Sequence, residues 1–332
     1  MTQFVSWVDV LGFASLMDDE PARAEEMWTK LRSLVEQGLS SSPGDARVYG
    51  INDGFFVISS DLTGLVRSLI TVYQSWCDHY SDAENSRPLL RGAIAEAASD
   101  KAAGGTNCIR MWLQGRGFRT AYENESILRG GRLFCEPIAG RLVEKAGFPA
   151  YLWKELSGWE ITEKRSKREV IEILWLAESN VDELIFRVEA IGRLYEQAIQ
   201  AFLKNEQSLD QKEAMKGFLQ HDETLKLALR SMGSYLRSHP EAEGAIGPVI
   251  ERYLNYNPNQ FRFTWGTTFV ALEAAFRGCH SQADNFAQRV TKYLDSRQSV
   301  AAHDPYVEDF RRELQKQTYS EFRQWYDMVS KR

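Results

Sequence analysis

Cysteine is scarce in this sequence, and the few cysteines are far apart. The 332-residue chain has only four, with no Cys-x-x-Cys spacing: Cys77, Cys108, Cys135 and Cys279. Small disulfide-stabilised secreted domains use many more cysteines, and structural zinc sites need paired thiolates. The N-terminus also lacks the basic segment and long apolar run of a secretion signal. These absences favour reduced thiols and a cytoplasmic protein.

Long apolar runs and an excess of positive charge are missing too. A bilayer-spanning helix needs roughly 18 or more apolar residues, and here Asp, Arg or Gly interrupts every apolar window well before that length. The formal net charge is −6, so the general basic field that attracts nucleic acid is absent. We expect neither a membrane nor a nucleic-acid partner. A local basic pocket for a phosphate-bearing ligand remains compatible with this charge.

The glycine motifs that commonly bind nucleotides are absent as well. The chain has no Gly-x-x-x-x-Gly-Lys-Ser/Thr loop and no Gly-x-Gly-x-x-Gly fingerprint, so it is neither a P-loop enzyme nor a typical dinucleotide-binding protein. It has no histidine or cysteine cluster that would hold zinc. Any nucleotide chemistry must therefore depend on other residues.

Two isolated carboxylates are the strongest functional signal that is present. Asp53 lies between two β-type runs in the hairpin-like stretch 47–59, and Asp9 lies inside the apolar run 4–13. A buried, unpaired charge at Asp9 would cost several kcal/mol. Two acids on strands of one sheet form a hard oxygen site suited to Mg²⁺ or Mn²⁺. The alternative is that Asp53 only makes the turn and Asp9 only ends a strand.

Hydrophobic periodicity predicts an α+β region followed by helices. Within the first region we expect helices at 22–38, 62–80 and 136–147, and strands at 88–95, 132–135, 148–153 and 169–176. Beyond residue 181 we expect helices, including 211–237, 245–253, 264–277, 281–294 and 305–329. The chain therefore divides into an α+β domain, 1–178, and an all-α domain, 179–332.

One segment of the first region fits neither pattern. Residues 98–131 are rich in Gly, Ala, Asn and Arg, which predicts an insertion of weak internal order with an exposed hairpin around 109–118. We assign it no chemistry. In the helix that follows, 136–147, we expect Ile138, Leu142 and Val143 to face inward.

Three basic residues are candidates for binding an anion. Arg91 interrupts the expected central strand, and an arginine there needs a negatively charged partner. Arg141 and Lys145 lie one turn apart on the helix 136–147. They are either an ordinary solvated face or, together with Arg91, the phosphate-binding side of a Mg²⁺-nucleotide pocket.

The order of these motifs resembles that of the class III nucleotidyl cyclases. The resemblance covers roughly residues 4–177 and is closest to the bacterial Pycsar antiphage pyrimidine cyclases. The matching stretches are Val8-Asp-Val-Leu-Gly-Phe13, Ile51-Asn-Asp-Gly-Phe55, Leu90-Arg-Gly-Ala-Ile94 and Pro137-Ile-Ala-Gly-Arg-Leu-Val-Glu144. It implies an α+β fold with a class III cyclase-like sheet flanked by helices, followed here by an all-α C-terminal domain.

The resemblance also implies a set of site residues and a reaction. Asp9 and Asp53, with the Val10 carbonyl, match the ligands of two divalent ions, Mn²⁺ or Mg²⁺. The implied enzyme is a phosphorus-oxygen lyase that converts UTP, or CTP, to the 3′,5′-cyclic monophosphate and pyrophosphate. Tyr49 matches a position near the base, and Arg91 a position near the base or the phosphates.

Arg141 matches the transition-state arginine of the same family. The asparagine that often precedes this arginine by four residues is replaced by Pro137. The family further implies a homodimer with composite active sites and a separate effector that responds to the cyclic nucleotide during antiphage defence. The alternatives are a catalytically inactive nucleotide- or partner-binding module and a helical interaction scaffold.

Overall fold

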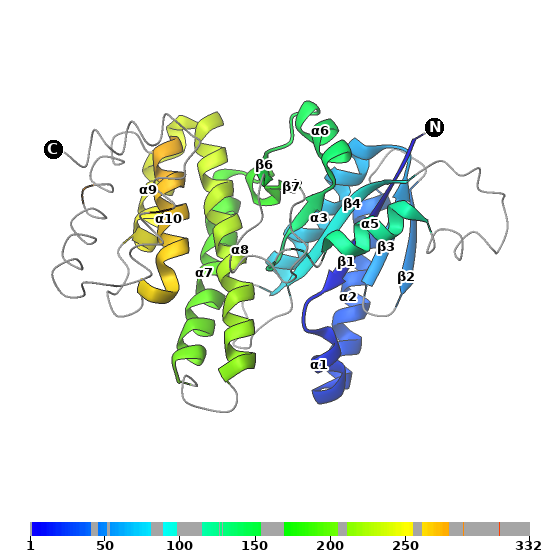
Figure 1. Ribbon diagram of the computed structural model, residues 1–332, viewed down its shortest axis with the longest axis horizontal. Helices are drawn as coiled ribbons and strands as arrows, with labels where there is room; N and C mark the ends of the chain where they lie inside the picture. Colours follow the sequence, from blue (N-terminus) through cyan, green and yellow to red (C-terminus); the bar gives the residue numbers. More distant parts are fainter. Residues whose placement is uncertain are drawn as a thin grey trace. The chain divides into compact units, whose positions relative to one another are not determined.

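The chain folds around a mixed β-sheet with helices on both sides (Figure 1). The structure is a computed structural model, and it describes residues 2–40, 46–51, 54–80, 89–97, 115–125, 127, 129–153, 169–204, 211–254, 261–278, 288 and 312. No helix in this part of the chain is both long enough and apolar enough to cross a membrane. The expected helices at 281–294 and 305–329 lie outside the described residues.

Seven strands form the described sheet, in the order β2-β3-β1-β4-β5-β7-β6. Their bounds are β1 Gln3–Val10, β2 Arg47–Ile51, β3 Gly54–Ser59, β4 Leu90–Ala97, β5 Leu133–Cys135, β6 Ala150–Trp153 and β7 Val170–Ile173. The β4–β5 pair is parallel, and all the other neighbours are antiparallel. The Asp9-bearing strand β1 pairs with β3 and β4, and its residues are buried on both faces of the sheet, which explains its continuous apolar sequence.

Helices cover both faces of this sheet because side chains alternate along each strand. The helices of this part are α1 Phe13–Asp19, α2 Pro21–Ser40, α3 Leu62–Tyr80, α5 Arg116–Glu125 and α6 Pro137–Lys145, with the short 3-10 helix η2 Trp175–Glu178. On one face, Ala121 and Phe118 of α5 pack on Val5 and Trp7 of β1. On the other, the ring of Trp28 in α2 stacks on Phe55 at 4.4 Å, and α3 lies beside α2.

The C-terminal part of the described chain is helical, as expected. It contains α7 Val181–Lys204, α8 Gln211–Ser238, η3 Pro240–Ala242, α9 Glu243–Leu254 and α10 Phe261–Gly278. By packing, Met1–Glu178 with Ala190–Thr224 forms one compact unit, and Ser179–Glu189 with Leu225–Arg332 forms a second. The α+β class with a helical C-terminal part is thus confirmed. The expected boundary at residue 178 stays a prediction, because α7 and α8 each contribute to both units.

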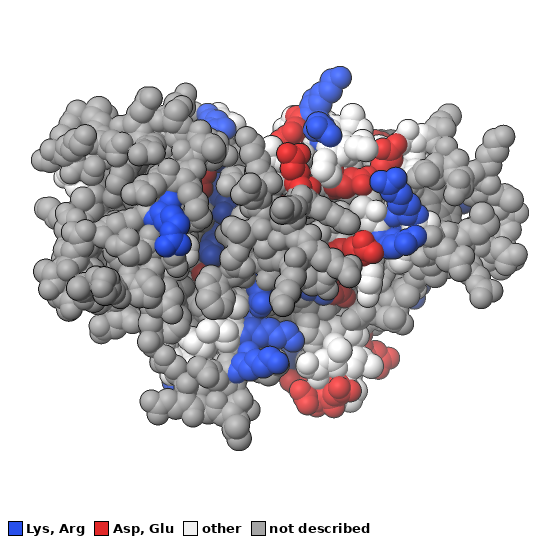
Figure 2. All heavy atoms as spheres, in the orientation of Figure 1, with Lys and Arg blue, Asp and Glu red and all other residues white. Residues whose placement is uncertain are grey.

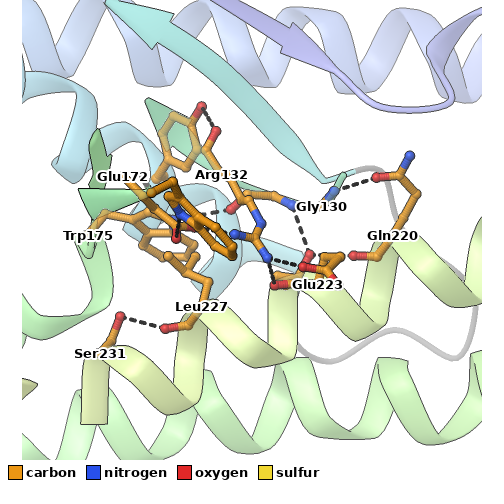
Figure 3. Close-up of polar contacts among 12 residues, drawn as sticks. Gly130, Arg132, Glu172, Trp175, Gln220, Glu223, Leu227 and Ser231 are labelled. Atoms are coloured by element: carbon orange, nitrogen blue, oxygen red, sulfur yellow. Dashed lines mark hydrogen bonds and ion pairs between the residues drawn. The ribbon is translucent and has the colours of Figure 1, made fainter. Parts of the chain in front are cut away.

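A buried charge cluster anchors the start of β5 inside the first unit (Figure 3). The Arg132 side chain is fully buried, and its Nη1 donates to Glu172 Oε1 at 2.9 Å. Its Nη2 donates to the Glu223 carbonyl at 2.9 Å and also pairs with the Glu223 carboxylate. The indole of Trp153 donates to the other oxygen of Glu172 at 2.9 Å. Both buried acids are therefore ion-paired with the same arginine, and Glu172 also accepts a hydrogen bond from Trp153, as buried charges require.

Two sequence predictions about local structure are wrong. Within the segment 98–131, expected to be a weakly ordered insertion, residues 116–125 form α5, a helix whose apolar residues pack on the sheet. Residues 98–114, including most of the expected hairpin at 109–118, lie outside the described residues. In α6, Val143 is buried but Ile138 and Leu142 are 53% and 45% exposed. The helix instead packs through Ala139, Gly140 and Val143, because Gly140 allows a close approach: a Cβ there would lie 2.6 Å from Ile171 Cβ.

Candidate active site

The strand register places Asp9 in one row with Arg91. Asp9 on β1 pairs with Arg91 on β4 and, on the other side, with Gly54 on β3. Directly paired residues in a sheet have Cα atoms about 4.5–5.5 Å apart and side chains on the same face. Arg91 Nη2 donates to Asp9 Oδ2 at 3.1 Å. The anionic partner that the sequence required for Arg91 is therefore the candidate metal ligand itself.

Gly54, the residue that follows Asp53 in the sequence, is packed tightly against β1. A Cβ on Gly54 would lie 2.7 Å from the Val8 carbonyl oxygen and within contact of the Trp7 ring. Only glycine allows this close approach of β3 to β1, so the residue after Asp53 is held against the Asp9 strand. Asp53 itself lies outside the described residues.

A third charged residue, Glu125, also contacts Arg91. Glu125, in the last turn of α5, forms an ion pair with Arg91 Nε. The Glu125 and Asp9 residues are only 3% and 8% exposed, so both carboxylates are shielded from water and share a single guanidinium. The cluster has one more negative than positive charge, and low exposure strengthens its attraction for a cation.

Sequence reasoning missed Glu125 because it lies in the segment to which we assigned no chemistry. A helical signal was present there: apolar residues recur at Phe118, Ala121 and Tyr122, and they pack on Trp7 and Phe56. This period places Glu125, four residues after Ala121, on the same inward side. Reading that stripe as a helix face would have indicated a buried acid.

Tyr49 lies on the same sheet face as Asp9, one row further along. It pairs with Phe56, which pairs with Trp7, and its ring stacks on Phe56 at 5.0 Å. Strand spacing and rise put the Cα atoms of Tyr49 and Asp9 roughly 12 Å apart. The ring packs at the edge of the cluster beneath α5. Val10, the other predicted ligand on β1, is buried and pairs with Leu90.

Arg141 is not brought to this cluster within one chain. It is exposed on α6, next to Gly140, which contacts Ile171. Ile171 pairs with Cys135, and Cys135 pairs with Ile94, whose side chain points away from the face that carries Arg91. Arg141 therefore belongs to a helix on the opposite side of the sheet from Asp9, Tyr49 and Arg91.

Tyr73 lies directly behind the Asp9 row. Its hydroxyl donates to the Arg132 carbonyl at 3.2 Å and lies against Gly92, where a Cβ would be 2.9 Å from the phenol oxygen. Burial, reinforced by the charge of Asp9 and opposed by Arg91, raises the pKa of Tyr73 well above its usual value. The phenol therefore stays protonated and acts as a hydrogen-bond donor.

Asp9 and Glu125 supply carboxylate oxygens, the ligand type that hard divalent cations prefer, and in this structure both are ion-paired with Arg91. Among the described residues, no group of three or more Asp, Glu, His or Cys side chains is close enough to hold a metal ion. The second predicted carboxylate, Asp53, is not among those residues.

Known proteins resemble this chain in structure only. No family model and no curated protein matches its sequence. An adenylate/guanylate cyclase/hydrolase from Silicibacter pomeroyi is 14% identical with a TM-score of 0.39, covering 52% of this chain and 96% of that one. A bacterial light-regulated adenylyl cyclase is 11% identical with a TM-score of 0.39, covering 58% and 97%.

A third solved structure is the guanylate cyclase domain of RhGC from Catenaria anguillulae in complex with GTP. It is 11% identical with a TM-score of 0.36, and the match covers 52% of this chain and 95% of that one. Likenesses as distant as these three establish no activity for this chain. Any function assigned to this chain therefore rests on Asp9 and the residues that pair with it, Arg91 and Gly54.

Proposed function

We propose that this chain is a metal-dependent nucleotidyl cyclase that converts UTP, or CTP, to its 3′,5′-cyclic monophosphate and pyrophosphate. The observation that carries the proposal is the row in which Asp9 pairs with both Arg91 and Gly54, the residue that follows Asp53. Two carboxylates close in the sheet, next to a partly buried arginine, would suit a divalent ion that carries a triphosphate.

In this proposal Asp9 and Asp53, with the Val10 carbonyl, hold two Mn²⁺ or Mg²⁺ ions. Bound divalent ions supply Lewis acidity that favours ionisation of the ribose 3′-hydroxyl and offsets the triphosphate charge. Arg91, released from Asp9, turns its guanidinium toward the base or the phosphates. Glu125 keeps that guanidinium oriented, since it already binds Nε.

Arg141 supplies the transition-state cation from a second copy of the chain. Its position on the opposite side of the sheet from Asp9 supports this, since one chain then presents the two halves of the site on different surfaces. The proposed enzyme is accordingly a homodimer with composite sites. In the cell we propose a cytoplasmic source of a cyclic-nucleotide messenger for antiphage defence, detected by a separate effector.

The decisive experiment is incubation of the purified protein with Mn²⁺ and each of the four nucleoside triphosphates. Chromatography with mass detection separates the cyclic products. We expect cUMP from UTP, with cCMP from CTP as the second possibility. Absence of every cyclic product, with correctly folded protein, would sink the proposal.

Base choice provides a finer test at Tyr49. If its hydroxyl hydrogen-bonds the pyrimidine, Tyr49→Phe leaves that group of the base unpaired. The transition-state stabilisation calculated from kcat/KM for the preferred nucleotide should then fall by about 1–3 kcal/mol. The ratio of UTP to CTP turnover should then relax, while metal affinity stays the same. An unchanged ratio and an unchanged rate would remove Tyr49 from the site.

One observation favours the alternative of a catalytically inactive nucleotide-binding module. Asp9 is already neutralised by Arg91, which Glu125 also binds, and Pro137 replaces the usual asparagine. Such a module would bind UTP in the presence of Mn²⁺ yet release no pyrophosphate. Measuring binding and pyrophosphate release on the same sample therefore discriminates between the two functions.

A further inference from the structure

A polar cleft lies alongside α5, separate from the cluster of Asp9, Arg91 and Glu125. It is a cleft of about 760 Å³ formed by α5, the start of α6 and the start of β7, all within the first compact unit. Its volume falls within the range of about 300–1,000 Å³ that is typical of small-ligand sites. It uses neither Asp9 nor Arg91, so the proposed cyclase does not account for it.

The cleft has positive charge at its rim. Arg116 and Arg119 line it from α5, three residues apart and therefore on one side of that helix, and both are exposed. The N-terminus of α6, at Pro137, also contributes to the lining and adds the positive end of a helix dipole. In Figure 2 basic and acidic side chains lie next to one another where Figure 1 places α5.

Carboxylates limit how much negative charge the cleft accepts. Glu123, Glu136 and Glu169 also line it. Burial raises the pKa of Glu136, although a hydrogen bond from the Glu96 backbone N–H opposes the shift. A triphosphate would place several negative charges against these acids, whereas one phosphate group matches the two arginines.

The inner wall carries a buried amide oxygen, the Oδ1 atom of Asn124, that accepts no hydrogen bond from the described residues. Asn124 is 3% exposed and lines the cleft, and its Oδ1 has no hydrogen-bond partner in the part of the chain that the structure describes. A buried acceptor without a partner is destabilising, so a ligand N–H that hydrogen-bonds to it gains binding free energy. The terminal torsion of Asn is broad, which lets the amide turn its oxygen toward the cleft.

We propose that this cleft binds a nucleoside monophosphate, with the phosphate at Arg116 and Arg119 and a base N–H donated to Asn124 Oδ1. The phosphate is at the exposed rim and the base is at the buried end, beside the apolar side chain of Val170. This site functions without Asp9, Asp53 or a metal ion. It therefore stands or falls independently of the cyclase proposal.

The test measures binding of UMP to the full chain by calorimetry, with EDTA present to exclude metal-dependent binding. Arg116→Gln and Arg119→Gln should each weaken UMP binding about tenfold, because each removes a charge-assisted bond to phosphate. The matched control is Arg32→Gln, an exposed arginine on α2, which should bind UMP as the wild type does. Asp9→Asn should also bind it normally.

The base contact is tested with altered ligands, so that the protein fold is not at risk. 3-Methyl-UMP lacks the imide N–H and ribose 5-phosphate lacks the base, and both should bind about tenfold more weakly than UMP. Equal affinity for UMP and 3-methyl-UMP would overturn the contact to Asn124. No binding up to about 10 mM UMP, or loss of binding in Asp9→Asn, would overturn the site.

Discussion

Asp9 shows how much of a single residue's chemistry is set by its neighbours across a sheet. Alone it is an acid in an apolar strand, a costly arrangement. In the folded chain, Arg91 Nη2 lies 3.1 Å from Asp9 Oδ2, and Arg91 Nε forms an ion pair with the Glu125 carboxylate. The buried carboxylate of Asp9 is thereby compensated by the guanidinium of Arg91.

Asp9→Asn tests this carboxylate with almost no change in shape. The amide cannot supply the charge that a divalent ion requires, so we expect Mn²⁺ binding, followed by electron paramagnetic resonance, to be lost together with any cyclase activity. The melting temperature should change little, because Arg91 keeps Glu125 as a partner. Asp18→Asn, on the exposed surface of α1, is the control. Retained Mn²⁺ affinity in Asp9→Asn would contradict the assignment.

His221 makes stability depend on pH. Burial lowers its pKa from 6.5 to about 4. Between these two values the unfolded chain takes up a proton that the folded chain does not, so stability falls as pH decreases from about 6.5 toward 4, by up to about 3 kcal/mol.

His221→Gln removes the pH-dependent contribution of this histidine to stability. Urea unfolding of the variant between pH 7 and 4 should therefore show a shallower decline in free energy than unfolding of the wild type. The exposed His239 provides the control, and His239→Gln should leave the wild-type profile unchanged. Parallel curves for wild type and His221→Gln would show that His221 does not carry this dependence.

At the scale of elements, α5 and the start of β5 determine what lies around the candidate site. Helix α5 covers the sheet face that carries Asp9 and Tyr49, and it supplies Glu125 to one site and Asn124 to the other. The start of β5 is held by Arg132, whose partners come from β7 and α8.

Arg132→Met should destabilise the protein by about 3–5 kcal/mol, because it leaves the carboxylates of Glu172 and Glu223 buried without their cation. Thermal and urea unfolding measure the loss. Arg32→Met is the matched control, since Arg32 pairs with Glu36 on an exposed helix surface and contributes within about 0.5 kcal/mol. A loss below about 1 kcal/mol in Arg132→Met would show that the cluster is not holding β5 in place.

At the scale of the whole molecule, the positions of Asp9 and Arg141 on opposite sides of the sheet lead to the proposed homodimer. In a two-fold dimer with composite sites, Asp9→Asn and Arg141→Ala disable the same site from different subunits. Each variant alone should therefore be inactive. A heterodimer of the two should retain one intact site.

Mixing the two inactive variants tests this arrangement. Random exchange makes half of the dimers heterodimers, each with one of two sites intact, so activity should recover to about a quarter of the wild-type value. Native mass spectrometry of the mixture, with one variant isotopically labelled, verifies that the subunits exchange. No recovery, under conditions where exchange is shown to occur, would mean that both residues act within one subunit. Activity of Arg141→Ala by itself would mean that Arg141 has no catalytic role.

Much of the fold was predictable because local patterns agree with the tertiary structure. The Asp9-bearing strand and the helices at 22–38, 62–80, 211–237, 245–253 and 264–277 are confirmed to within a few residues. Glu172 illustrates the limit. It lies in a predicted strand, yet nothing in the neighbouring sequence indicates that Arg132, forty residues earlier, neutralises it.

The sequence by itself determined most of the described elements other than α5, the isolation of Asp9 and Asp53 as acids among apolar residues, and the need of Arg91 for an anion, because these follow from periodicity and the cost of burying charge. Only the tertiary structure decided that Arg91 meets Asp9 and Glu125, that α5 covers this face, and that Arg141 lies on the opposite side of the sheet. Those facts depend on strand order and register, which join residues up to 82 positions apart. No local pattern encodes such pairings.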